Sequence, residues 1–207
     1  MPLGAASPEV MAHLGGLEPR FAEIHRLYGP PPWRRTRNSF RSLGRAIIYQ
    51  QVAGKAAAAV FARVRALYPG SRFPTPEMVA ATPFETLQGA GLSRQKATYL
   101  QDLATAYLEG AIQPRRFDRM SDREILDTLT AVRGIGPWTA EIFLMFDLLR
   151  PDVLPVGDYG IQQGFRILDD LEQLPDADAM RRRAEIWRPH RSLACWYLWR
   201  LLEHSRT

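Results

Sequence analysis

The sequence predicts an all-α protein of roughly ten helices joined by short connections. Three observations support this fold class. Apolar residues recur at helical spacing, helix start signals are frequent, and the alternating pattern typical of strands is scarce. Hydrophobic residues make up 46% of the 207 residues, so the chain can bury a sizeable core.

Two consecutive helices are predicted from the spacing of their apolar residues. The first contains Phe40, Leu43, Ile47 and Ile48 and continues to Gln51. The second contains Val60, Phe61, Val64 and Leu67. Helix breakers precede and follow this pair, at Gly29 with Pro30–Pro32 and at Gly70.

Polar residues mark where later helices begin. Thr82, Pro83 and Glu85 supply a predicted cap, a first-turn proline and a capping-box glutamate. Ser121 and Glu124 repeat the capping box. The remaining predicted helix starts are Ser93, Asp158 and Ser192.

The composition restricts the compartment and the cofactor chemistry. Cys195 is the only cysteine, which excludes an intrachain disulfide and a four-cysteine iron–sulfur cluster. No apolar run reaches membrane-spanning length and the N-terminus has no signal-like core, so a cytoplasmic protein is expected. The formal net charge of +5 is compatible with an anionic partner.

The stretch from Val132 to Ala140 carries the most specific pattern of the chain. Gly134 and Gly136 flank one aliphatic residue between two predicted helices, a spacing that makes a tight hairpin with outward-pointing backbone amides. Such amides hold a phosphate without a side-chain charge. Asp158 follows in the loop Leu154–Gly160. A phosphate clamp with an acid just downstream suggests chemistry on nucleic acid.

These features, in order over residues 39–199, resemble the helix-hairpin-helix-GPD superfamily of base-excision DNA glycosylases. Within it, the chain resembles the alkylpurine branch of the bacterial 3-methyladenine DNA glycosylase II type. The segments that carry the resemblance are Ala46–Val52, Gly91–Ala97, the hairpin, Leu154–Gly160 and Trp187–Ser192.

The resemblance implies two helical lobes with a cleft between them. Residues 41–150 would form the helix-hairpin-helix lobe, and residues 1–40 and 151–207 would share the other. The bacterial relative has an extra N-terminal β domain, which is not expected here because too few residues precede Ser39. Trp187 is expected to pack between the lobes.

Asp158 has two compatible interpretations. An aspartate before Tyr159 satisfies the free amides at a helix start, where a negative charge is also favoured. By resemblance, Asp158 is also the catalytic acid, which stabilises positive charge on the deoxyribose as the glycosidic bond breaks and orients or deprotonates water. The chemistry parallels glycoside hydrolysis through an oxocarbenium-like transition state.

Trp138 decides the subclass. Superfamily members that also cleave the strand carry a lysine at this position, two residues after the second hairpin glycine, and form a Schiff base with the sugar. The tryptophan here disfavours lyase chemistry. Trp138 is either a core residue or a wall of the base pocket, where an indole face attracts a cationic alkylated base by ~0.5–2 kcal/mol.

Three further residues are candidates for the base pocket. Trp199 matches a pocket tryptophan of the resembled family, whereas Ile142 stands where the relative has a tyrosine, so this wall is less aromatic. Gln51 either faces the cleft or is a hydrogen-bonded core residue.

The remaining candidates bind DNA. The hairpin, through Arg133, the amides of Gly134 and Gly136, and Thr139, would hold a phosphate, unless it is only a turn between helices. The family hairpin also holds a monovalent cation, Na+ or K+, which here would lie at the backbone carbonyls of Arg133 and Ile135.

The segment Gly91–Lys96 is the expected wedge loop. A flipped base leaves a hole that a side chain must fill, and Leu92 or Arg94 is placed to do so. Ser93 would cap the next helix and touch the backbone of DNA, with Lys96 beside it. Alternatively, Leu92 is an ordinary packing residue.

Together these features predict a monofunctional DNA glycosylase that flips alkylated bases out of duplex DNA and hydrolyses the N-glycosidic bond. It would act in the nucleoid as a monomer and require no cofactor. The alternatives are a bifunctional glycosylase-lyase for oxidised bases and a catalytically silent helix-hairpin-helix DNA-binding module. The sequence leaves the lesion open among 3-methyladenine, 7-methylguanine, 1-methyladenine, ethenoadenine and hypoxanthine.

Overall fold

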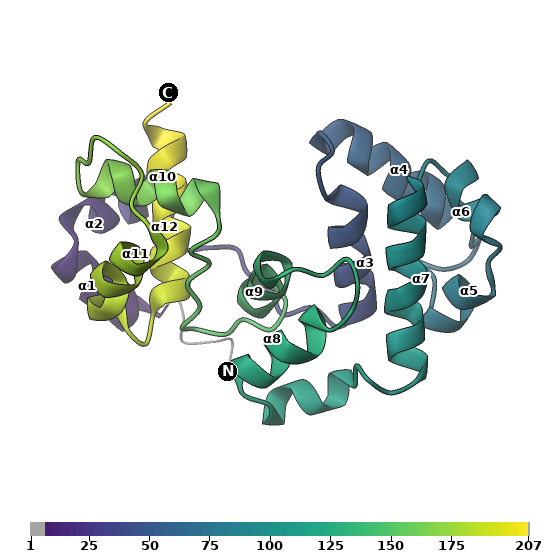
Figure 1. Cartoon of the computed structure of the whole chain (residues 1–207). Coiled ribbons are helices and arrows are strands. Elements are labelled where there is room, and N and C mark those ends of the chain that lie inside the picture. Colours follow the sequence, from purple (N-terminus) through teal and green to yellow (C-terminus); the bar gives the residue numbers. More distant parts are fainter. Residues whose placement is uncertain (1–6, 207) are drawn as a thin grey trace. The chain divides into compact units, whose positions relative to one another are not determined.

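The structure is a computed structural model that describes residues 7–206. Over this range the chain has helices and no strand, which confirms the predicted all-α class (Figure 1). The described residues form twelve α-helices and two 3-10 helices, slightly more than the sequence predicted. The extra elements are short and connect the longer helices.

The helices follow one another along the chain with short connections. They are α1 (Pro8–Leu17), α2 (Pro19–Tyr28), α3 (Ser39–Tyr49), α4 (Gly54–Ala66), α5 (Pro76–Ala81), α6 (Phe84–Gly89), α7 (Arg94–Leu108), η2 (Pro114–Arg119), α8 (Asp122–Thr130), α9 (Pro137–Phe146), α10 (Tyr159–Leu168), α11 (Ala177–Arg183), η3 (Ala184–Trp187) and α12 (Arg191–His204).

The chain divides into two compact units. The terminal unit comprises Met1–Arg35 and Leu144–Thr207, and the central unit comprises Thr36–Phe143. The sequence placed the corresponding boundaries at residues 40 and 150. In the structure the first break precedes α3, and the second falls inside α9, because the last turn of α9 packs with residues of the terminal unit.

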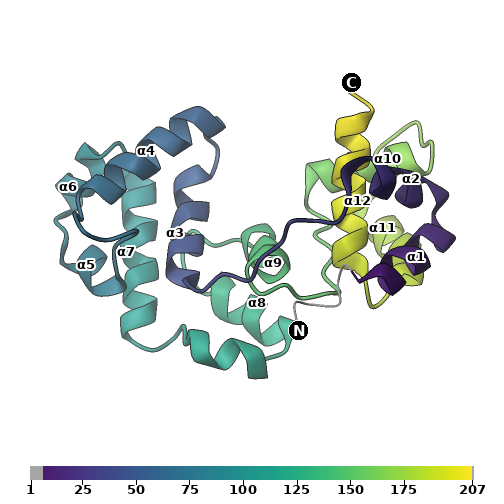
Figure 2. The ribbon, with the colours of Figure 1, turned by 180° about the vertical axis from the view of Figure 1, so that it is seen from behind.

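The central unit is built around α7, which lies between α3 on one side and α5 and α6 on the other (Figures 1 and 2). The buried faces of α3 and α7 repeat at helical spacing, as expected for amphipathic helices. A Cβ atom at Gly44 of α3 would lie 2.9 Å from the Phe73 ring and 3.2 Å from Leu100. The absent side chain therefore lets α3 pack closely in this core.

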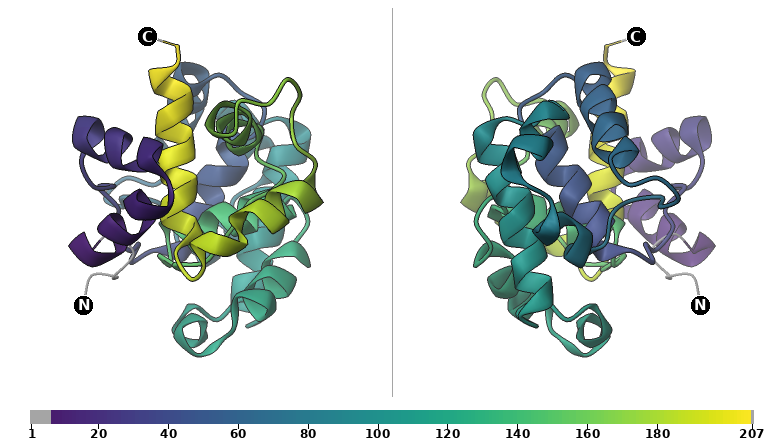
Figure 3. Two further views of the ribbon diagram at one scale, coloured as in Figure 1. Left: turned by 90° about the vertical axis from the view of Figure 1, so that its left-hand side faces the viewer. Right: turned by 90° about the vertical axis from the view of Figure 1, so that its right-hand side faces the viewer.

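The terminal unit is built around α12, which packs against α2 and α10 (Figure 3). The side chains of α12 from Ser192 to Leu198 are all buried. A Cβ atom at Gly164 of α10 would lie 2.6 Å from the Leu198 Cβ atom. Glycine at this position lets the backbones of α10 and α12 approach, which brings the starting loop of α10 beside the side chains of α12.

Trp187 corrects one expectation. Its ring is fully buried within the terminal unit, 5.3 Å from the ring of Phe21 and 5.2 Å from that of Phe165. Its indole Nε1 donates a 3.0 Å hydrogen bond to the buried carboxylate of Glu18, which also pairs with Arg183. Trp187 is therefore a core residue of one unit, and not a residue between two.

The predicted helix starts have mixed outcomes. Ser121 and Glu124 form the capping box as predicted, and Ser93 and Asp158 each cap a helix. Thr82 was assigned wrongly. It ends α5, and its hydroxyl donates to the Met78 carbonyl instead of opening the next helix.

Ser192 is also placed differently from the prediction. His190 occupies the cap of α12, and Ser192 lies in its first turn. The Ser192 hydroxyl donates to the carbonyl of Arg150 at 2.6 Å and accepts from the amide of Val153 at 3.0 Å. A side chain predicted to open α12 therefore ties α12 to the chain that leads into the Asp158 loop.

No helix of the described part of the chain is long and apolar enough to cross a membrane. Among the same residues, no group of three or more His, Cys, Asp and Glu side chains is placed to hold a metal ion.

Candidate functional site

Asp158 is the residue around which the candidate site of the terminal unit is built. Its loop is closed by the Asp158 amide, which donates to the Pro155 carbonyl at 2.9 Å. Its carboxylate Oδ1 accepts a 2.9 Å hydrogen bond from the Ile161 amide, which makes Asp158 the cap of α10. The side chain is only 9% exposed. Two of the roles predicted for Asp158, a cap and a positioned acid, are thus geometrically compatible.

Trp199 of α12 contacts the same carboxylate. Its indole Nε1 donates a 2.9 Å hydrogen bond to Oδ1 of Asp158. A Cβ atom at Gly160 would lie 2.8 Å from Cδ1 of the Trp199 ring and 3.0 Å from Oδ1 of Asp158. Glycine at 160 therefore leaves the space in which the indole reaches the carboxylate.

Two aromatic residues extend this arrangement. The Phe146 ring stacks on Trp199 with centroids 5.6 Å apart and planes 25° apart. The Trp33 ring meets Phe146 edge-on at 5.4 Å. We call Trp33, Phe146 and Trp199 the aromatic row. Because Phe146 covers one face of Trp199, an aromatic ligand that stacks on Trp199 must use the other face.

The sequence analysis missed Trp33 and Phe146. Trp33 lies in a proline-rich connection without helical periodicity, and Phe146 ends a helix whose other residues are nearly all apolar. Neither position carries a local signal, since the row forms only when three distant segments pack together. The sequence analysis also missed Tyr159. This residue could have been found, because it directly follows Asp158.

Tyr159 is the most exposed aromatic side chain near the site, at 61%. Its hydroxyl accepts a 2.7 Å hydrogen bond from Nε2 of Gln163, one turn later on α10. The ring is therefore held at the start of α10 without being buried, and it is available to a ligand that approaches Asp158.

The hairpin of the central unit connects α8 to α9. The Ile135 amide donates to the Val132 carbonyl at 3.1 Å, and the Ile135 side chain is buried. Gly134 adopts a φ of +92°, and the ring of Tyr99 fills the space where its side chain would be. Nε2 of Gln50 donates to the Gly134 carbonyl at 2.8 Å.

These contacts distinguish the two hairpin glycines. A glycine in such a hairpin can serve either a positive φ or a close approach by a ligand. Positive φ is found at Gly134 and not at Gly136. A Cβ atom at Gly136 would have no other atom within 4 Å, so Gly136 faces open space. Gly134 is required by the fold, and Gly136 is free for a close approach by a ligand.

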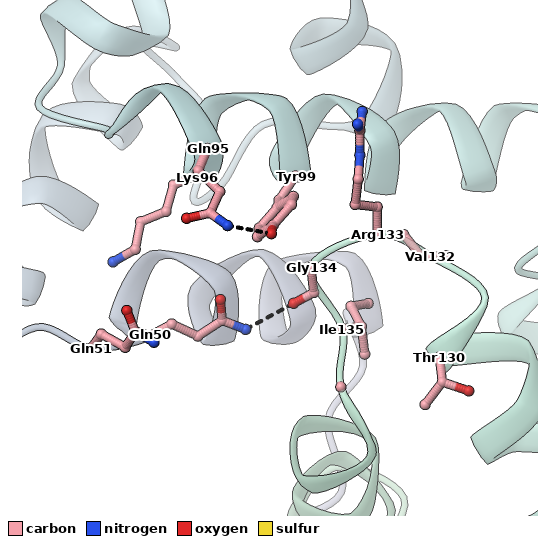
Figure 4. A pocket seen from close by; sticks show the side chains of 11 residues that line it. Gln50, Gln51, Gln95, Lys96, Tyr99, Thr130, Val132, Arg133, Gly134 and Ile135 are labelled. Atoms are coloured by element: carbon pink, nitrogen blue, oxygen red, sulfur yellow. Dashed lines mark hydrogen bonds between the residues drawn. The ribbon is translucent and has the colours of Figure 1, made fainter.

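A hollow of about 360 Å³ opens beside the hairpin (Figure 4). The hairpin forms one side of it, and residues at the end of α3 and the start of α7 form the rest. Figure 4 shows Gln50 and Tyr99 directed toward the hairpin from these two helices. Its lining residues are Gln50, Gln51, Gln95, Lys96, Tyr99, Thr130, Val132, Arg133, Gly134, Ile135 and Gly136.

The Arg133 side chain makes a contact that the sequence did not predict. Its guanidinium Nε donates a 2.7 Å hydrogen bond to the carboxylate of Asp102 on α7. This bond raises the pKa of Arg133 above its ordinary value. The side chain therefore connects the hairpin to α7, and it stays 66% exposed to solvent.

One of the two residues predicted to act as a wedge is not exposed. Leu92 is only 4% exposed and belongs to the core, so it is not available to enter a DNA stack. Ser93 caps α7 through the Lys96 amide. Arg94 is exposed, with its guanidinium 5.8 Å from the Phe84 ring. Of the two predicted wedge residues, only Arg94 can reach a ligand.

Lys96 has a structural contact that the sequence did not predict. Its Nζ donates a 2.7 Å hydrogen bond to the carbonyl of Ile48 near the end of α3, where carbonyls lack partners within the helix. Partial burial lowers the pKa of this lysine. Lys96 thus joins α7 to α3 beneath the hollow.

The other predicted residues fall in different environments. Trp138 is 46% exposed in the first turn of α9, whereas Thr139 is buried and Ile142 is partly buried. Gln51 lies beyond the end of α3, is exposed, and has a φ of 53°. The prediction that α3 continues through Gln51 was therefore wrong, and its alternative as a core residue is excluded. The shared pocket of Trp138 and Trp199 stays a prediction.

Comparison with known proteins adds independent evidence. The family described as "HhH-GPD superfamily base excision DNA repair protein" matches residues 45–189. DNA-3-methyladenine glycosylase 1 of Schizosaccharomyces pombe is 35% identical over 192 residues, which cover 91% of this chain and 84% of the relative. DNA-3-methyladenine glycosylase 2 of Escherichia coli is 34% identical over 171 residues, covering 78% of this chain and 57% of the relative.

Solved structures show the same similarity. The 3-methyladenine DNA glycosylase of S. pombe, in complex with abasic DNA, superposes with a TM-score of 0.80 at 34% identity, covering 92% of this chain and 95% of that chain. A DNA-3-methyladenine glycosidase from Bacillus halodurans has a TM-score of 0.85 at 32% identity, covering 97% and 91%.

The hairpin geometry predicts different effects of alanine at its two glycines. Gly134→Ala should lower the melting temperature, because positive φ alone costs ~1–2 kcal/mol for a residue with a Cβ atom and the Tyr99 ring must also move. At ~2–4 °C per kcal/mol for a chain of this size, the loss is measurable by calorimetry. Gly136→Ala, the matched control, should melt like the wild type. Equal melting of both variants would contradict the assigned roles.

Proposed function

This chain belongs to the HhH-GPD superfamily of base excision DNA repair proteins, and from that premise we propose that it is a DNA glycosylase for alkylated bases. It would turn the damaged nucleotide out of the duplex and hydrolyse its N-glycosidic bond. The observation that carries the proposal is the buried carboxylate of Asp158, fixed by the Ile161 amide and the Trp199 indole beside an aromatic row.

Asp158 is the proposed catalytic residue. As the bond from the sugar to the base breaks, positive charge develops on the deoxyribose, and a preorganised carboxylate stabilises it. The two donors to Oδ1 hold the carboxylate in place before the substrate arrives. It would also orient the water that attacks the sugar, so the free base leaves and an abasic site stays in the DNA.

The aromatic row suits a cationic leaving group. An alkylated purine often carries positive charge, which weakens its bond to the sugar and attracts it to the face of an aromatic ring. One face of Trp199 stacks on Phe146, which in turn contacts Trp33. This arrangement favours alkylated purines as the substrate class, in agreement with the names of the relatives.

The hairpin would bind the DNA backbone. Gly136 faces open space, so a phosphate can approach the backbone amides that precede α9 without meeting a side chain. Arg94, Ser93 and the edge of the nearby hollow are the other proposed DNA contacts of the central unit.

We also propose a monovalent cation, Na+ or K+, at the hairpin. Such a cation prefers oxygen ligands, and the Gly134 carbonyl is already used by Gln50, so the carbonyls of Arg133 and Ile135 would hold it. When bound, it would add positive charge next to the phosphate. We propose no other cofactor, and we expect a monomer that acts on chromosomal DNA in the nucleoid.

The first test removes the negative charge of Asp158 and retains the helix cap. Asp158→Asn should slow release of 7-methylguanine from duplex DNA by roughly 10²–10³-fold or more, since a preorganised charge at the reacting centre is lost. The measurement is single-turnover base release at saturating enzyme. Binding to undamaged duplex should be unchanged.

Asp176→Asn is the matched control for this test. Asp176 also caps a helix of the terminal unit, through the Ala179 amide at 2.7 Å, but it belongs to α11. Asparagine is as good a cap as aspartate, so this variant should excise at the wild-type rate. Substantial excision by Asp158→Asn would remove Asp158 from the catalytic role.

The second test addresses the type of glycosylase. The chain contains only two lysines, Lys55 and Lys96, and Lys96 is engaged by the Ile48 carbonyl. Trp138 occupies the position of the lysine used by bifunctional relatives. Borohydride should therefore trap no covalent complex with DNA, and the product strand should stay intact until heated in alkali. A trapped complex would establish a glycosylase-lyase instead.

A further inference from the structure

Positive charge is distributed very unevenly along this chain. Residues 24–76 contain ten arginines and lysines and no aspartate or glutamate. The whole chain has a formal net charge of only +5, so all the remaining residues together carry a net charge of −5. The modest overall charge therefore conceals one strongly basic segment, which includes α3 and α4 of the central unit.

The exposed face of α3 concentrates this charge. Arg41 and Arg45 are four residues apart in α3 and therefore lie on one side of it, and Arg37 lies two residues before the helix begins. Arg41 and Arg45 are about 6 Å apart along the helix axis. All three residues are exposed. We call Arg37, Arg41 and Arg45 the arginine stripe.

The arginine stripe lacks the acidic partners that neutralise other arginines of the central unit. Arg123 pairs with Asp127 at 2.9 Å, and Arg133 pairs with Asp102 at 2.7 Å. No ion pair joins Arg37, Arg41 or Arg45 to any acid among the described residues. The charge of the stripe is therefore fully available to an external anion.

The stripe leads toward the hairpin. The Arg45 guanidinium lies over the Tyr49 ring, 4.0 Å from its centroid, which directs it toward the end of α3. The next residue, Gln50, donates to the hairpin carbonyl of Gly134. Lys55 is exposed in the first turn of α4, just beyond this point. Arg45 and Lys55 thus lie on either side of the segment that contacts the proposed phosphate site, within one unit.

We propose that the arginine stripe, with Lys55, is a second DNA-backbone site that binds phosphates independently of any lesion. A row of unpaired arginines about one phosphate spacing apart, extending from a backbone-amide phosphate site, fits a polyanion that crosses both. This inference rests on the proposed function in one respect, which is that the ligand is duplex DNA. Its role is to set affinity for undamaged DNA during the search, since it lies outside the residues that touch the base.

The salt dependence of DNA binding reports directly on such contacts. Each phosphate that a cation neutralises releases counterions and contributes roughly 0.9 to the slope of log K against log salt concentration. The Arg41→Gln/Arg45→Gln variant should bind an undamaged duplex more weakly, with a slope smaller by roughly 1.8. Fluorescence anisotropy over a salt series measures both quantities. Single-turnover excision at saturating enzyme should keep the wild-type rate.

Two variants serve as controls. Arg115→Gln/Arg119→Gln makes the same change in net charge at exposed arginines of η2 and should leave the slope unchanged. Arg41→Lys/Arg45→Lys keeps the charges and should keep the slope near that of the wild type. An unchanged slope in the Arg41→Gln/Arg45→Gln variant would overturn the proposal. An equal decrease in the η2 variant would also overturn it, because net charge alone would then explain the effect.

Melting curves of the variants would show whether unfolding causes the weaker DNA binding. Base release by the wild-type protein separates this proposal from the glycosylase proposal. If the wild-type protein released no base from any lesion duplex, the glycosylase proposal would fail, while the comparison of salt slopes would still decide whether the stripe binds DNA.

Discussion

The candidate site of the terminal unit is organised around one oxygen atom, Oδ1 of Asp158. Oδ1 of Asp158 accepts hydrogen bonds from the Ile161 amide at the start of α10 and from the Trp199 indole on α12. The Ile161 amide is a local cap of α10, whereas the Trp199 indole requires close packing of α10 and α12. Glycines at 160 and 164 allow this packing, because side chains there would collide with Trp199 and Leu198. The acid is thereby fixed by the same packing that forms the core, and its position needs no contribution from substrate.

Under the proposed function, the same contacts would serve both stability and catalysis. A capped helix start favours a carboxylate, and a carboxylate held by fixed donors in a nearly buried site is suited to stabilise developing positive charge. The aromatic row adds a surface for a flat, cationic base next to that charge. The central unit contributes a different kind of recognition, since its hairpin and its arginine stripe offer amides and unpaired guanidinium groups to DNA phosphates.

The sequence predicted correctly those features that depend on residues close together in the chain. The capping box of Ser121 and Glu124 and the cap at Asp158 involve residues three positions apart, so the spacing alone revealed them. The hairpin and the acid were also recognisable, because their order along the chain matches a known family. Tertiary packing decided the rest. Leu92 looks like an exposed wedge in sequence, but its side chain is drawn into the core. Phe146 and Trp33 contact each other and Trp199 across distant segments of the chain. No spacing of residues in the sequence predicts these contacts.

The central claim is that the Trp199 indole positions the catalytic carboxylate through its N–H group. Trp199→Phe keeps an aromatic ring that can stack on Phe146 and removes the hydrogen-bond donor together with the second ring of the indole. Hydrogen bonds to charged groups contribute about 1.5–3 kcal/mol, so we predict that single-turnover release of 7-methylguanine slows by roughly 10–100-fold. Because the same hydrogen bond also stabilises the fold, the melting temperature should fall by roughly 3–12 °C, while the affinity for undamaged duplex should stay near the wild-type value. Excision at the wild-type rate by a stably folded Trp199→Phe variant would contradict this account.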